Sequence, residues 1–65
     1  MVKNYVIEFA NDIINTNRDN PLMLDSVRNA IEDYTNHVLD TYNRGLIISR
    51  EAVYLMSKDY DFLNH

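Results

Sequence analysis

The chain contains no cysteine, and this absence limits the ways in which so short a protein can be stabilised. Without thiols, disulfides and thiolate-bound zinc or iron–sulfur centres are excluded. The two histidines, His37 and His65, are far apart in the sequence, so neither a metal nor another cofactor is predicted. A domain of 65 residues buries only about 60% of the surface that its unfolded chain exposes. Because disulfides are excluded and no metal site is predicted, association with a second chain is the remaining way to stabilise so small a fold.

Glycine and positive charge are also scarce. With one glycine, the chain cannot form a glycine-rich phosphate loop. Its six lysines and arginines are scattered and outnumbered by ten acidic residues, which makes nucleic acid and anionic membranes poor partners. No long apolar run is present that could span a bilayer or serve as a signal peptide. We therefore expect an acidic cytoplasmic protein, in the cytosol of a bacterium or of a host cell.

The clearest periodic signal lies between Pro21 and Arg44, where apolar residues recur at alternating spacings of three and four. Such residues fall on one side of an α-helix. Asn20 is the predicted N-cap, Pro21 suits a first turn, and Gly45 is typical of a residue that closes a helix. The pattern predicts a long central helix over 21–44 with an apolar seam. Phe9, from an earlier helical pattern, is expected to join this seam. The seam consists of Phe9, Leu24, Val27, Ile31, Tyr34 and Val38.

Two further amphipathic patterns predict helices over 2–15 and 50–63, the latter capped by Ser49. The expected fold class is therefore all-α, with three helices in one domain covering 1–65. A central helix over 21–44 would be about 36 Å long, whereas a helix of about 14 residues covers only about 21 Å. Because shorter outer helices would leave part of the seam uncovered, we expect a dimeric helical bundle or a stable complex with another protein.

Opposite the seam, the central helix carries a stripe of acidic and amide side chains at helical spacing. The stripe is interpreted first as a solvated outer face, which most surface helices have. The second interpretation is a surface complementary to a basic partner protein. The candidate partner-binding residues of this acidic stripe are Asp25, Asn29, Glu32, Asn36 and Asp40.

Motifs for metal binding or catalysis are not found. Asn15, Asn17 and Asp19 alternate as in a calcium loop, but Asn20 replaces the required glycine. Asp33, His37 and Asp40 share a helix face, which indicates a surface hydrogen-bonding cluster more readily than a metal site. Asp59 and Asp61 lie in a polar terminal segment with nothing in the sequence to raise a pKa. We therefore do not expect an enzyme.

The remaining function classes both depend on binding. The first is a non-enzymatic protein–protein interaction module, a small inhibitor or adaptor that occupies a surface of its partner. The high asparagine and isoleucine content is typical of AT-rich coding, which suits a phage or mobile-element protein. Either the acidic stripe or the wide apolar arc of the first helix could meet the partner. The alternative is a small dimeric regulatory protein that contacts nucleic acid, which the scattered cations disfavour.

Overall fold

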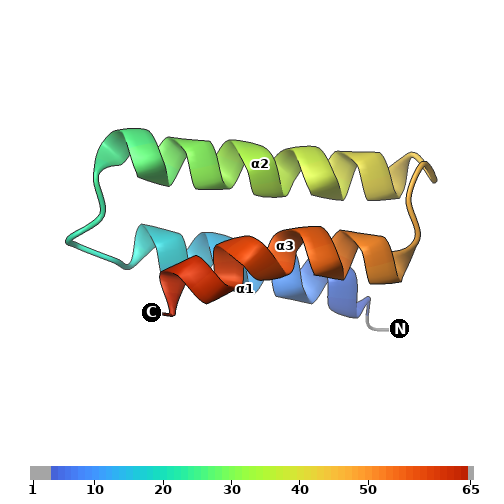
Figure 1. The fold of residues 1–65 in the computed structure, drawn as a ribbon, viewed down its shortest axis with the longest axis horizontal. Coiled ribbons are helices and arrows are strands. Elements are labelled where there is room, and N and C mark those ends of the chain that lie inside the picture. Colours follow the sequence, from blue (N-terminus) through green and yellow to red (C-terminus); the bar gives the residue numbers. More distant parts are fainter. Residues whose placement is uncertain (1–3, 65) are drawn as a thin grey trace.

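The computed structural model describes residues 4–64, which form three α-helices joined by two short connections (Figure 1). These helices are α1 (Tyr5–Arg18), α2 (Asp25–Asn43) and α3 (Ser49–Leu63). α2 runs antiparallel to both other helices, and each helix packs against the other two (Figure 1). Residues 4–64 contain no strand, and the predicted all-α, three-helix class is confirmed.

One contiguous core lies where the three helices meet. α1 contributes a stripe of buried apolar residues spaced by about one helical turn, and α2 and α3 contribute two buried apolar residues each. The seam predicted for α2 divides between interior and surface: Ile31 and Val38 are buried, whereas Leu24 is 70% exposed and Tyr34 is 38% exposed. Phe9 and Val27 pack at the margin of the core. The buried apolar residues are Val6, Ala10, Ile13, Ile31, Val38, Ala52 and Met56.

α1 begins and ends three residues later than the predicted range 2–15, of which positions 2 and 3 lie outside the described residues. Asn4 caps the first turn, since its side-chain oxygen accepts hydrogen bonds from the amides of Val6 (3.0 Å) and Ile7 (3.4 Å). At the other end, the buried side chain of Asn17 is hydrogen-bonded to the main chain of α2. This tertiary contact keeps residues 16–18 in the helix, although the sequence predicted that the first helix ends at residue 15.

The predicted range 21–44 for the central helix is wrong at its start. Asn20 does not cap α2, because its side-chain oxygen accepts from the amide of Leu22 at 3.1 Å and forms a turn instead. The residue before the helix is Leu24, which is extended and offers no side-chain cap. α2 has 19 residues and is about 28 Å long, closer in length to the 15-residue α3. The mismatch in length is therefore smaller than expected, and one copy of the chain buries Ile31 and Val38.

The connection from α2 to α3 follows the predicted glycine. Gly45 has φ 76°, and its amide donates to the carbonyl oxygen of Tyr42 (3.0 Å), while the amide of Leu46 donates to Thr41 (3.2 Å). These two bonds are those of a Schellman C-terminal motif. The prediction that Ser49 caps α3 is wrong, because its hydroxyl is hydrogen-bonded to the Tyr42 hydroxyl and α3 already includes it.

Candidate functional site

An open groove of about 420 Å³ lies between α2 and α3. One wall comes from the first half of α2 and the other from the last two turns of α3, so the helix pairing itself creates the groove. Its lining is apolar apart from a hydroxyl at one end and one carboxylate. The lining residues are Ser26, Val27, Ala30, Ile31, Asp59 and Phe62.

Asp59 is the charged residue of this α2–α3 groove. One of its oxygens accepts a hydrogen bond from the buried Thr35 hydroxyl at 3.4 Å. Partial burial raises the pKa of the Asp59 carboxyl above its usual range, and the bond from Thr35 offsets this rise only in part. The sequence-based expectation that nothing raises the pKa of this carboxyl was wrong, because the burial that raises it arises only when the helices pack together. Within residues 4–64, no cation lies within 4.0 Å of it.

The residue next to Asp59 does not neutralise it. The Lys58 ammonium lies over the ring of Tyr54, 5.4 Å from the ring centre, in a cation–π contact. Tyr54 is also part of a second hollow of about 390 Å³ on α3, together with Arg50, Glu51 and Leu55. This second hollow is separate from the α2–α3 groove, because the two share no lining residue.

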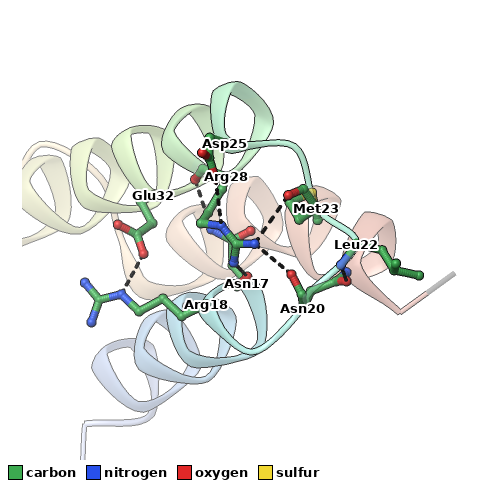
Figure 2. A network of polar contacts seen from close by, with 8 residues as sticks. All are labelled: Asn17, Arg18, Asn20, Leu22, Met23, Asp25, Arg28 and Glu32. Atoms are coloured by element: carbon green, nitrogen blue, oxygen red, sulfur yellow. Dashed lines mark hydrogen bonds and ion pairs between the residues drawn. The ribbon is translucent and has the colours of Figure 1, made fainter.

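A separate polar cluster joins α1 to the start of α2 (Figure 2). The Arg28 guanidinium donates to the carbonyl oxygens of Asn17, of Asn20 (2.7 Å) and, more weakly, of Met23 (3.4 Å). The Asn17 side-chain amide donates in return to the Arg28 carbonyl at 2.9 Å. The Asn17 carbonyl lies in the last turn of α1 and the Asn20 carbonyl just beyond it, where partners within the helix are missing. The cluster therefore has a structural role, which the sequence pattern did not indicate.

The acidic stripe proposed for partner binding lies on the surface of α2, but its charges are largely balanced. Glu32 is bound to Arg18 at 2.7 Å, and Asp40 is bound to Arg44 at 3.1 Å. Asp25 lies 4.0 Å from Arg28. The remaining members, Asn29 and Asn36, are exposed amides. Because each of these carboxylates has an arginine beside it, the stripe carries less net negative charge than the sequence suggests. The same pairing makes three of the four arginines less suited to binding a phosphate.

Two further polar groups lie on α2. Asp33, His37 and Asp40 share no hydrogen bond with one another among the described residues, and the Asp40 carboxylate binds Arg44. Near the end of α2, Ser49 and Asn4 both donate to the Tyr42 hydroxyl and lower its pKa. Within residues 4–64, no group of three histidine or acidic side chains is placed to hold a metal ion.

No protein-family model, no curated protein and no solved structure matches this chain. Among residues 4–64, no helix combines the length and the apolar character needed to cross a membrane. The groove between α2 and α3 is therefore the candidate site on the grounds of its geometry alone. In the sequence, Asp59 stands out only as a neighbour of Asp61, and nothing marks Phe62 as a site residue. The spacing of Leu55, Asp59 and Phe62 by four and three residues was the available signal for a shared face.

Proposed function

We propose that the chain is a non-enzymatic protein-interaction module that acts as an inhibitor or adaptor by occupying part of a partner's surface. The observation that carries this proposal is the exposed apolar lining of the α2–α3 groove. Phe62 is 56% exposed, and Ala30 on the opposite wall is also exposed. Contiguous apolar surface around a hollow is a common feature of protein-binding sites.

The polar content of the groove supports binding rather than catalysis. Acid–base or nucleophilic chemistry requires at least two groups that act on the same atoms, with one group positioned by the other. The groove offers the Asp59 carboxylate and, from α2, the Ser26 hydroxyl, and neither is hydrogen-bonded to a histidine or lysine among the described residues. A partly buried carboxylate surrounded by apolar side chains is suited to recognising a partner's charge.

The alternative function, a small dimeric regulator that contacts nucleic acid, gains no support from the charge distribution. Arg18, Arg28 and Arg44 each lie within 4.0 Å of a carboxylate. A phosphate backbone is bound by several unpaired cations on one face. Self-association remains a proposal of its own, and size-exclusion chromatography with light scattering tests it directly.

The experiment that tests the proposed function compares two substitutions of the same kind at opposite ends of the bundle. Phe62→Asp places a charge in the groove, whereas Leu46→Asp places one at a 71% exposed site in the α2–α3 connection. Both side chains are largely exposed, so both variants should keep the helical circular dichroism of the unmodified chain. We expect a partner captured from lysate of the source cells to be lost with Phe62→Asp and retained with Leu46→Asp. Equal capture by both variants would contradict the proposal.

A further inference from the structure

We propose, building on the protein-binding function above, that the α2–α3 groove receives an amphipathic helix of the partner whose single lysine or arginine pairs with Asp59. The occupant carries apolar side chains on one helix face and one basic residue within that face. The shape of the groove, its carboxylate and the ion pairs in the rest of the chain favour this occupant.

The lining of the groove favours a helix as the occupant. Its two walls are helix surfaces, residues 26–31 of α2 and 59–62 of α3. A partner helix presents apolar residues at spacings of three and four along one face, which suits a groove between two helices. Val27 and Ile31, one turn apart on α2, form a wall with the same periodicity.

The charge of Asp59 favours a basic residue in that helix. The carboxylate lies in an apolar groove, where a charge is unfavourable unless it is paired. Thr35 supplies one hydrogen bond at 3.4 Å, Lys58 is held over Tyr54, and no other cation of residues 4–64 lies within 4.0 Å. A partner's ammonium or guanidinium would supply the missing opposite charge at the moment of docking, when the surrounding apolar contacts exclude water.

A second copy of the chain is a poorer occupant of the groove. In a two-fold symmetric contact the same patch faces itself, so a contact centred on the groove brings Asp59 close to the partner copy's own carboxylate. Like charges held together in a desolvated contact oppose association. Three of the four arginines are already beside acidic residues of the same chain, and Lys58 is held over Tyr54. Arg50 is the remaining cation among residues 4–64, and it lies more than about two turns before Asp59 on α3.

A display library of helical peptides tests the chemistry of the occupant directly, whatever the identity of the partner. Peptides of 14 residues, about four turns long, would be randomised along one face and selected on the full-length chain. Affinities of the selected peptides would then be measured by fluorescence anisotropy for the unmodified chain, Asp59→Asn and Asp61→Asn. Asn preserves an acceptor for Thr35 while removing the charge, and Asp61 supplies the matched control because it is an exposed carboxylate of the same helix.

We expect the selected peptides to share a lysine or arginine within their apolar face. Asp59→Asn should weaken their binding roughly tenfold, and Asp61→Asn should change it less than about twofold. Replacing the basic residue of the peptide with glutamine should weaken binding to the unmodified chain and have little further effect on Asp59→Asn. Such coupling identifies a direct pair, because a purely structural role of Asp59 would leave the two changes additive.

Three other results would overturn the inference, and each has a different consequence. Selected peptides that bind the groove without a basic residue, and are insensitive to Asp59→Asn, would refute the charge pairing but leave the docking function intact. Failure to select any peptide whose binding Phe62→Asp abolishes would refute both. Self-association that competes with the peptides and is abolished by Phe62→Asp would make a second copy the occupant.

Discussion

Arg28 and Asn17 each bind the other's main-chain carbonyl, Arg28 through its guanidinium and Asn17 through its side-chain amide (Figure 2). The pair joins the last turn of α1 to the first turn of α2 across a connection of six residues, 19–24. Because the same guanidinium also binds the carbonyl of Asn20, it holds the connection in its turn conformation. The start of α2 is therefore set by a tertiary contact.

We expect Arg28→Met to lower the free energy of unfolding by about 1.5–3 kcal/mol, because it removes hydrogen bonds from a charged donor to the carbonyl oxygens of Asn17 and Asn20. Arg18→Met is the matched control. Arg18 is largely exposed and makes one ion pair, with Glu32, so its loss should cost about 0.5 kcal/mol or less. Urea unfolding followed by circular dichroism measures both values. Equal effects of the two substitutions would show that the Arg28 cluster does not stabilise the connection.

Gly45→Ala should lower the free energy of unfolding by about 1 kcal/mol. The backbone of Gly45 has φ 76°, which is strained for alanine, whereas a Cβ built there meets no atom within 4 Å. The cost should therefore be conformational rather than steric. Gly45→Asn should recover part of it, because asparagine tolerates left-handed backbone better than alanine does. Equal stability of the alanine and asparagine variants in urea would contradict this explanation.

Asp59→Asn should stabilise the free protein at neutral pH while weakening binding of a basic helix. Burial raises the pKa of Asp59 in the folded chain, so the ionised carboxylate opposes folding above that pKa. The advantage of the asparagine variant should be complete above the folded-state pKa and decline as the pH falls toward the unfolded-state value. Below the unfolded-state value it should be lost. Urea midpoints of both proteins between pH 3 and pH 7 test the sign, and a variant less stable than the unmodified chain at pH 7 would contradict it.

The sequence was sufficient for the fold class because the relevant signals are local. Helical periodicity places Ile31 and Val38 in the interior, and the need for positive φ identifies Gly45 as the end of α2. The start of α2 could not be predicted in the same way. Asn20 and Pro21 are suitable residues for a helix start, but the hydrogen bonds from Arg28 to the connection outweigh that local preference.

The candidate site was less accessible to sequence analysis because it arises between helices. The pairing of α2 with α3 brings Val27 and Ala30 beside Asp59, which is about 30 residues away in the chain. The acidic stripe, in contrast, was correctly placed on the surface of α2, but its arginine partners were not foreseen. Arg18 reaches Glu32 from another helix, so the spacing along α2 carries no sign of that ion pair.

Ile31→Asp should unfold the chain, whereas Asn29→Asp should leave it folded. Ile31 is buried in the core, so the new carboxylate would lose several kcal/mol of hydration free energy without gaining a partner. A chain of 65 residues has a total stability of roughly 3–10 kcal/mol, which such a loss can exhaust. Asn29 is exposed on the same helix and supplies the control for charge alone. Circular dichroism over a range of concentrations, with light scattering on the same samples, separates unfolding from dissociation. An Ile31→Asp variant with an unchanged helical spectrum and cooperative melting would show that burial of the Ile31 side chain is not needed for folding.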